Sequence, residues 1–274
     1  MKRTVCALLV LFTAATLAWA ETPVDQTKPA KPDGRVKVET VAGSITVTGW
    51  DKAEVRVQGT LGDQMEPLVF EVTDGTTRIE AEPKKNARGD GSAHLQVWVP
   101  KGSSVEAAGV SADVAAKGIS GSVEVGSVSG DVKASGISGE LVAECVSGGV
   151  EVEASGRSLR CETVSGRLQV TGGSPERVQL QSVSGGINYT GSLARTGQLT
   201  AETVSGDVEL ALPSSFSADF DVSTFSGAIR SDLSTPANVQ EEGPVGKKAA
   251  FTTGSGDAHV KVETFSGSVR FLAK

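Results

Sequence analysis

Serine is the residue type that most invites a catalytic interpretation here, because it recurs in one short phrase: an apolar residue followed by Ser-Gly. A nucleophilic serine needs a base within hydrogen-bond reach and a third group that orients this base, whereas the only histidines are His94 and His259. Many equivalent serines are better explained as turn residues, with glycine free to take a positive φ and the hydroxyl bonded to local backbone. We therefore predict no catalytic residues. The phrases are Ile119-Ser120-Gly121, Val128-Ser129-Gly130, Ile137-Ser138-Gly139, Val146-Ser147-Gly148, Val164-Ser165-Gly166, Val183-Ser184-Gly185, Val204-Ser205-Gly206, Phe225-Ser226-Gly227 and Phe265-Ser266-Gly267.

Aspartate follows the turn at several positions, which suggests calcium as a ligand. Nonapeptide calcium-binding β-rolls carry a Gly-Gly-x-Gly-x-Asp turn whose carbonyls and carboxylates surround each ion. The glycine triplet is missing here, so a turn role for the aspartates is favoured, calcium stays an alternative, and we predict no metal or other cofactor. These aspartates are Asp113, Asp131, Asp207 and Asp257. The same column elsewhere holds Gly149, Arg167, Gly186 and Ala228.

The phrase returns at a regular spacing, which is typical of a repeat architecture in which each unit buries its apolar face against its neighbours. Phrase glycines from Gly121 to Gly148 are nine residues apart, and the following steps to Gly166, Gly185, Gly206 and Gly227 are 18, 19, 21 and 21 residues. A full coil therefore holds about two phrases, with two strands and two turns. The sequence predicts an all-β fold, a single-stranded parallel β-helix with 18–21 residues per coil, which we expect to be right-handed.

Period-two alternation around each phrase predicts which side chains face the interior. Positions two and four residues after the phrase glycine, and five residues before it, are apolar. Charged or polar residues stand between them and are expected to face solvent. The predicted inward positions include Val123, Val132, Leu141, Val150, Leu168, Ile187, Val208, Ile229 and Val269, then Val125, Ala134, Ala143, Val152, Val170, Tyr189, Leu210 and Phe271, then Cys161, Leu180, Ala201, Val222 and Val262.

The chain divides by composition into a leader, a cap and the repeats. Residues 1–20 have a basic start, an apolar run and an Ala-Trp-Ala end, which predict a secretory signal peptide and an exported protein of the periplasm, cell surface or extracellular space. Residues 21–34 are rich in proline and charge and are expected to be a flexible leader. Residues 35–100 lack the strict phrase and are predicted to form a β cap, and residues 101–274 carry the repeats, with an insertion loop at 235–248.

The charge of the chain argues against nucleic acid as a partner. Removal of residues 1–20 takes away Lys2 and Arg3, which leaves 24 basic against 33 acidic side chains, a net charge of −9. Nucleic-acid recognition depends on clustered Lys and Arg. The apolar run near the N-terminus is too short to favour a stable membrane span.

The sequence also resembles a known family. The segments that carry the resemblance are the signal peptide, residues 43–55 (GSITVTGWDKAEV), residues 97–100 (VWVP) and the serial VSGDV phrases. Together they resemble the exported bacterial β-strand-repeat domain labelled "putative adhesin", a domain of unknown function. The resemblance implies a parallel β-helix and no catalytic residues.

Two hypotheses for function follow, from different classes. The first is a non-enzymatic exported scaffold or adhesin-like surface protein, which binds an unknown protein or glycan. The alternative is a β-helix that binds or cleaves polysaccharide, for which a lyase would need calcium and an exposed basic residue. Arg167 and Arg230 have suitable positions for such a base, but no carboxylate cluster accompanies either residue.

Two cysteines remain after the signal peptide. Cys145 and Cys161 are expected to point inward from adjacent coils with an offset of two residues, which places their Cα atoms roughly 8 Å apart. This exceeds the usual range for a disulfide, so we predict two buried free thiols.

The last phrase stops shortly after its second strand, without a polar cap. Phe265, Val269 and Phe271 would then lie near an exposed end of the core, and such edges are usually covered or charged. Either residues 235–248 fold over this end, or two molecules associate end to end through the C-terminal coil.

Overall fold

The structure, a computed structural model, describes residues 21–274 except 86–88, 234–236, 238 and 243–245. The described residues form 23 strands of one mostly parallel sheet and contain no helix, which confirms the all-β prediction. No described segment is therefore a helix that could span a membrane. The predicted signal peptide, residues 1–20, lies outside the described residues, as does part of the predicted insertion loop at 235–248.

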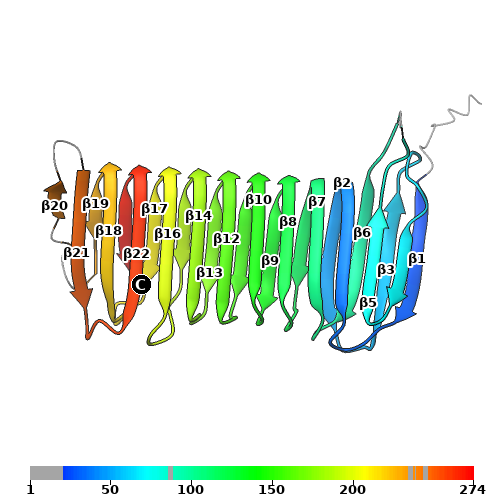
Figure 1. Cartoon of the computed structure of the whole chain (residues 1–274), viewed down its shortest axis with the longest axis horizontal. Helices are drawn as coiled ribbons and strands as arrows, with labels where there is room; N and C mark the ends of the chain where they lie inside the picture. Colours follow the sequence, from blue (N-terminus) through cyan, green and yellow to red (C-terminus); the bar gives the residue numbers. More distant parts are fainter. Residues whose placement is uncertain (1–20, 86–88, 234–236, 238, 243–245) are drawn as a thin grey trace, which may run out of the picture.

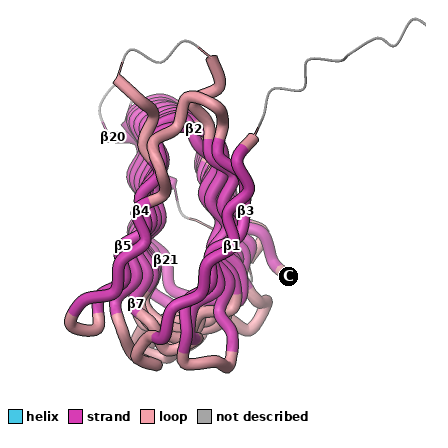
Figure 2. Tube along the Cα trace, turned by 90° about the vertical axis from the view of Figure 1, so that its right-hand side faces the viewer, coloured by secondary structure: helices cyan, strands magenta, loops and turns pink. Residues whose placement is uncertain are grey.

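The strands of the central region lie in two facing rows, because each strand pairs in parallel with the next but one (Figures 1 and 2). Leu141 pairs with Leu159, Leu159 with Val178, and Val178 with Leu199, so the register advances by 18, 19 and 21 residues. Row A contains β8 (Val123–Ser129), β10 (Leu141–Ser147), β12 (Ser158–Ser165), β14 (Arg177–Ser184) and β16 (Gln198–Ser205). Row B contains β9 (Val132–Ile137), β11 (Val150–Ala154), β13 (Leu168–Gly172), β15 (Ile187–Thr190) and β17 (Val208–Leu212). A strand of row A and the strand of row B that follows it are called a unit below.

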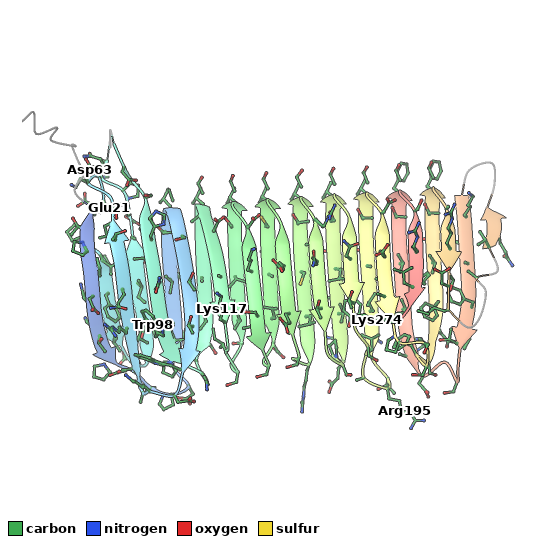
Figure 3. All side chains as sticks on the ribbon, turned by 180° about the vertical axis from the view of Figure 1, so that it is seen from behind. Glu21, Asp63, Trp98, Lys117, Arg195 and Lys274 are labelled. Atoms are coloured by element: carbon green, nitrogen blue, oxygen red, sulfur yellow. The ribbon has the colours of Figure 1, made fainter. Side chains whose placement is uncertain are left out.

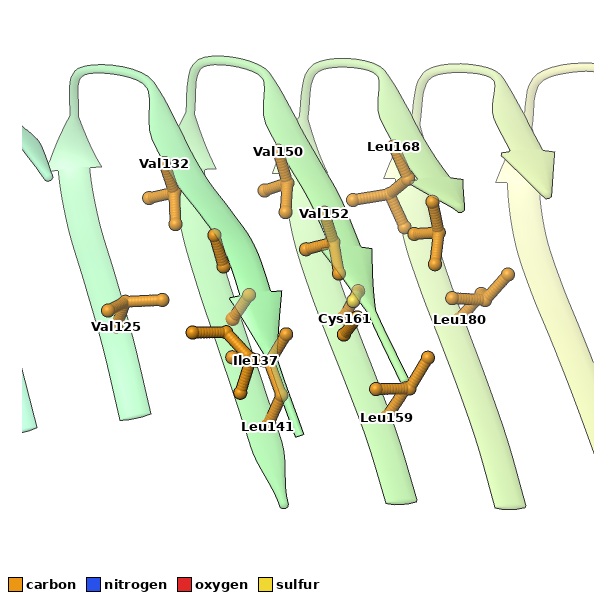
Figure 4. Close-up of a cluster of buried hydrophobic side chains, with 14 of the residues drawn as sticks. Val125, Val132, Ile137, Leu141, Val150, Val152, Leu159, Cys161, Leu168 and Leu180 are labelled. Carbon is orange, nitrogen blue, oxygen red and sulfur yellow. The ribbon is translucent and has the colours of Figure 1, made fainter. Parts of the chain in front are cut away.

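The core fills the space between the two rows. All of the predicted inward positions are buried, and Figure 4 shows side chains such as Val125, Val150 and Leu180 pointing into this space. Small aliphatic side chains suit the interior because the two rows lie close together and every unit repeats the same cross-section. The prediction from period-two alternation is therefore confirmed for these columns.

The phrase glycines lie where neighbouring units approach each other most closely. A Cβ atom added to Gly185 would overlap the carbonyl oxygen of Gly166, and one added to Gly166 would overlap that of Gly148. Of the nine phrase glycines, all of which the structure describes, only Gly148 has a positive φ. The expected reason for glycine, a positive φ, is thus wrong for most phrases, and the observed reason is the lack of room for a side chain.

Two long strands connect the rows near the N-terminal end. β2 (Arg35–Trp50) and β7 (Ser104–Lys117) each run through both rows and pair with each other over most of their length. β5 (Thr76–Ala81) pairs with the first part of β2 and β6 (Ala93–Pro100) with its second part. The sheet therefore continues without a break from one row to the other.

The N-terminal end corrects the prediction of a flexible leader at 21–34. β1 (Thr22–Pro29) pairs antiparallel with β3 (Glu54–Leu61), which itself pairs antiparallel with β6, and β4 (Val69–Thr73) covers β5 in the same manner. Arg56 donates to both carboxylate oxygens of Asp25 at 3.0 and 2.8 Å. Lys28 reaches across to donate to the Phe70 carbonyl at 2.7 Å. These long-range contacts order a segment whose local composition has no apolar period.

The C-terminal end corrects a second prediction, because the last unit is not at the end of the stack. β22 (Ala258–Ser266) pairs with β16 on one side and β18 (Ala218–Ser226) on the other, and β23 (Val269–Ala273) lies between β17 and β19 (Ile229–Ser231). Both edges of this unit are paired, so end-to-end association through the C-terminal coil has no free edge to use. Phe271 and Val269 are buried within the core, whereas Phe265 lies outside it.

The described part of the insertion covers the end instead. β21 (Gly246–Thr253) pairs antiparallel with β18, and β20 (Val239–Glu242) pairs antiparallel with β21. Phe251 of β21 stacks on Phe220 with ring centroids 4.6 Å apart, and Phe271 packs edge-on against both rings. Row A thus ends in antiparallel strands at both ends of the molecule.

Candidate interaction surface

A row of exposed apolar side chains follows one long edge of the molecule. The apolar residues of the Val-Ser-Gly and Phe-Ser-Gly phrases stand where the strands of row A, and β18 and β22 beyond them, end, and Figure 1 shows these strand ends aligned along that edge. Val41 and Val110 hold the equivalent positions within the long strands β2 and β7. Side chains rise in a line along the edge in Figure 3. We call this line the ridge. Its members, in the order of the stack and 38–58% exposed, are Val41, Val110, Val128, Val146, Val164, Val183, Val204, Phe265 and Phe225.

Alternation along each strand explains why the ridge faces solvent. In β8, Val125 and Ser127 point inward, so Val128 must point outward. The position before the ridge is small and polar in most units and serves the packing of neighbouring units. Ser127 donates to the Ala112 carbonyl at 2.7 Å, Cys145 to the Gly130 carbonyl at 3.2 Å and Thr264 to the Gly206 carbonyl at 3.4 Å. In three central units the buried hydroxyl at this position has no hydrogen-bond partner among the described residues. These residues are Thr163, Ser182 and Thr203.

A groove of about 890 Å³ runs beside the ridge. It extends from Ala108 of β7 to Phe265 of β22 and is bounded on the other side by a column of outward residues on row A. This column is acidic from Glu144 onward except at Gln181, while the small residues Ala108 and Gly126 leave its beginning open. The column consists of Ala108, Gly126, Glu144, Glu162, Gln181, Glu202 and Glu263. The alternation in the sequence predicted a solvent-facing position for the polar members of this column, but not for Ala108 and Gly126, and it did not identify the ridge.

Basic and amide side chains partly offset the charge of the acidic column. Arg160 donates to Glu162 at 2.6 Å, Lys261 lies 3.0 Å from Glu263, and Gln181 donates to Glu202 at 3.0 Å. The hydrogen bond with Glu162 raises the pKa of Arg160, and that with Glu263 raises the pKa of Lys261. These exposed pairs contribute little to stability.

The aspartates after the turn hold neighbouring units together. The backbone N–H of Asp131 donates to Asp113 Oδ1 at 2.9 Å, and that of Gly149 donates to Asp131 Oδ1 at 2.9 Å. Asp207 accepts from the Ser268 N–H at 2.7 Å. Asp257 differs, because hydrogen bonds from Ser255 and Ser217 and the nearby Arg195 lower its pKa. Backbone hydrogen bonds between units, and not only within a turn as expected, therefore account for Asp113, Asp131 and Asp207. Within the described ranges no three His, Cys, Asp or Glu side chains gather as metal ligands would.

The structure reveals one serine–histidine contact that the sequence did not suggest. Ser44 Oγ lies 2.9 Å from His94 Nδ1, where β2 and β6 run side by side. Ser44 is not a phrase serine, and the pair is exposed. No third group orients His94 among the hydrogen bonds of the described residues, so the contact lacks the arrangement of a catalytic triad. Ser44 and His94 are 50 residues apart in the sequence, so only the pairing of β2 with β6 shows that they meet.

The two arginines considered for lyase chemistry lie far apart. Arg167 lines a shallow recess of about 190 Å³ with Asp131, Lys133 and Glu151. Arg230 lies on β19, beside Arg270. Between β13 and β19 the row contains β15, β17 and β23, so four strand spacings, roughly 19 Å, separate the two arginines. Either arginine would therefore have to act by itself, and Arg167 has two carboxylates, Asp131 and Glu151, beside it, which the sequence did not indicate.

Both cysteines are free and buried, as predicted. Ala143 pairs with Cys161 and Cys145 with Thr163, which confirms the two-residue offset. Burial raises the pKa of Cys161 to about 12 and also raises that of Cys145. Neither thiol is a reactive nucleophile in the folded protein.

Comparison with known proteins places the chain in a family. Residues 44–271 match the model of the Toastrack DUF4097 family, so the chain belongs to this family and the resemblance seen in the sequence is confirmed. No curated protein matches the sequence.

Several solved structures are similar over nearly all of the chain at low identity. One is a putative lipid binding protein from Parabacteroides distasonis (14% identity, 91% of this chain and 96% of that chain, TM-score 0.46). Another is a putative adhesin from Bacteroides fragilis (11%, 93% and 99%, TM-score 0.40). A third is a putative cell adhesion protein from Clostridium sporogenes (13%, 92% and 100%, TM-score 0.28). TM-scores below 0.5 carry no argument about function, so the function has to be inferred from the surface of this chain.

Proposed function

We propose that this protein is an exported, non-enzymatic scaffold or adhesin-like protein whose contact surface is the ridge with its adjoining groove. The observation that carries the proposal is the unbroken line of exposed apolar side chains from Val41 to Phe225. Contiguous exposed apolar patches on soluble proteins mark interaction sites, whereas single exposed apolar residues do not. Export to the periplasm, cell surface or extracellular space rests on the signal-peptide pattern of residues 1–20.

The backbone suits this role because it repeats one contact element many times. We infer a single-stranded parallel β-helix that is right-handed, as crossover connections between parallel strands almost always are. Hydrogen bonding between successive units holds the ridge side chains in line. A rigid surface loses little conformational entropy when it binds a partner.

The alternative, a polysaccharide-binding or polysaccharide-cleaving protein, has less support from the surface. Sugar rings stack on exposed aromatic faces, but valine makes up most of the apolar wall of the groove. Trp50 and Trp98 lie with ring centroids 6.3 Å apart on other strands. Lys52 lies over Trp50 at 4.6 Å and Arg56 over Trp98 at 5.9 Å.

An adhesion assay tests the proposal. Beads would carry the mature chain at low density, and their binding to glycan arrays, lipid vesicles and cell-envelope preparations would be measured. We expect the variant Val128→Ser/Val146→Ser/Val164→Ser to bind at least about tenfold more weakly, because its apolar contacts are lost. The control replaces Glu153, Thr171 and Thr190, at the end of row B away from the ridge, with serine.

Equal binding by the ridge variant and by the unchanged protein would overturn the proposal. A separate arm would add acidic polysaccharides with and without calcium. Calcium-dependent cleavage would establish the enzymatic alternative in place of the scaffold.

A further inference from the structure

We propose that the partner of the ridge is a second copy of this chain, which lies side by side and parallel with the first so that the two ridges meet. The inference rests on the proposed function, because it names the partner of the same surface. It concerns the long edge of the molecule and differs from the end-to-end contact that the sequence suggested.

The spacing of the ridge is the first argument. Its members sit on hydrogen-bonded neighbouring strands, which lie about 4.8 Å apart. Side chains on one face of an extended peptide repeat every ~6.8 Å, and successive turns of an α-helix every ~5.4 Å. Over the eight spacings from Val41 to Phe225 a helix would drift out of step by roughly 5 Å. A second stack of parallel strands has the same repeat, so every ridge member can be contacted.

The size of the surface is the second argument. Eight strand spacings give a ridge about 38 Å long, and the ridge with its two flanking columns is about 15 Å wide. Contact along this strip would cover on the order of 600 Å² on each copy, about 1,200 Å² in all, which is the lower end of the range for specific interfaces. The inference therefore predicts a dimer that dissociates on dilution.

The flanks of the ridge decide the orientation. Glu144, Glu162 and Glu202 lie on the row A side only. In a two-fold dimer with parallel stacks, this side faces the row B side of the partner, which carries both signs of charge, including Lys133 and Arg167. With antiparallel stacks the acidic columns would face each other, and like charges repel. An isologous parallel contact satisfies both the spacing and the charge.

A cationic amphipathic segment is the competing occupant, because an acidic column beside an apolar ridge would attract it. Two of the carboxylates, Glu162 and Glu263, already have ion pairs with Arg160 and Lys261. These ion pairs offset part of the attraction, and such a segment lacks the repeat of the ridge. Ionic strength separates the two cases, because salt weakens binding to a cationic segment and strengthens association between copies that are both negatively charged.

Sedimentation velocity on the full mature chain tests the inference, from low micromolar to several hundred micromolar protein and at low and high salt. We expect a monomer–dimer equilibrium that shifts toward dimer with both concentration and salt. Val164→Lys/Val183→Lys should raise the dissociation constant at least about tenfold. The control, Thr171→Lys/Thr190→Lys, adds the same charge to the same units at the end of row B away from the ridge and should change it less than about threefold.

Cysteine cross-linking tests the orientation. Val128→Cys, Val164→Cys and Val204→Cys, made one at a time, should each form a disulfide-linked dimer, because equivalent residues meet all along a parallel interface. Antiparallel stacks would link at no more than one of these positions and would overturn the parallel arrangement. The native Cys145 and Cys161 are buried, and the unchanged protein serves as the blank.

A chain that stays monomeric under all conditions, or a dimer that the ridge variant leaves intact, would overturn the inference. The bead assay judges the proposed function separately, because chains coupled at low density cannot pair. If the ridge variant loses bead binding while the unchanged chain stays monomeric, the ridge is still a contact surface and its partner is a different molecule.

Discussion

The two long edges of this molecule contain the same apolar-Ser-Gly phrase, but its apolar residue is exposed on one edge and buried on the other. On one edge, Val128 and Val146 are 48% and 46% exposed and belong to the ridge. On the other edge, Ile119 and Ile137 are 1% and 0% exposed and belong to the core. In each case an aliphatic residue precedes Ser-Gly, so the residue pattern alone does not distinguish a contact surface from a core position.

A local change in the backbone accounts for the difference. Gly118 and Gly136, the residues before the two isoleucines, have a φ of 63°. The pairing of β11 with β9 shifts at this point, since Glu153 pairs with Ser135 and Ala154 with Ile137. Under strict alternation the isoleucine would point outward, and this bulge turns it to the inner face. On the ridge edge no such shift occurs, and the valine stays outside.

The largest expected effect concerns the phrase glycine on the ridge edge. Gly185→Ala should destabilise the protein by more than about 3 kcal/mol or prevent folding, because the new Cβ would overlap the backbone of the neighbouring unit. The neighbouring Gly186→Ala is the control, since its Cβ would meet the Asp207 oxygen at an ordinary 3.5 Å. Urea denaturation followed by circular dichroism measures both. Equal stability of the two variants would show that close stacking is not what requires glycine here.

Alanine substitutions at the isoleucine and valine positions should differ in their effect on stability almost as much as the two glycine variants do. Ile137→Ala leaves a cavity in the core and should cost about 3 kcal/mol of unfolding free energy. Val146→Ala should change stability by less than about 0.5 kcal/mol, because the side chain already contacts water. The same denaturation experiment applies. A large loss with Val146→Ala would mean that the ridge supports the fold and is not free for a partner.

The buried Cys161 thiol, in the core behind the ridge, should make the free energy of unfolding depend on pH. Cys161 has a pKa of about 12 in the folded chain and an ordinary value of 9.0, so the unfolded thiol ionises first as pH rises. Its contribution is complete below pH 9.0 and is lost between pH 9.0 and about 12, by about 1.4 kcal/mol per pH unit.

Denaturation at a series of pH values with Cys161→Ala should flatten this loss just above pH 9.0. Cys145→Ser places a hydroxyl where other units have serine or threonine, and most of the loss should remain. An unchanged slope in Cys161→Ala would show that the thiol is not the titrating group.

The smallest effect should come from the bulge itself. Gly136→Ala places a Cβ 3.6 Å from its nearest neighbour, so only the positive φ opposes it. The cost should be about 1 kcal/mol. Gly126→Ala, at an outward position with a Cβ 3.5 Å from the Glu144 oxygen, should be neutral. Calorimetry of the two variants compares them, and a neutral Gly136→Ala would contradict the bulge as the source of the difference between the edges.

Much of the fold could be predicted from the sequence because it follows from local alternation. The inward columns, the parallel stacking of phrases and the offset of Cys145 from Cys161 depend only on a period of two residues and a period of one coil. The ridge could have been found by extending the alternation by one more residue, from Ser127 to Val128. The Ile137 position could not, because the bulge that moves it becomes visible only in the pairing with β11.

The sequence by itself determined what each unit looks like, and the tertiary structure decided where the irregular units go. β18 and β22 end in the same Thr-Phe-Ser-Gly segment, so either could pair with β16 by its pattern, yet β22 does. Residues 22–29 have no apolar period and still form a strand, because β3 offers a free edge. Local sequence fixes alternation and turns, since these depend on neighbouring residues. The choice among equivalent edges depends on contacts between residues far apart, such as the packing of Phe220, Phe251 and Phe271.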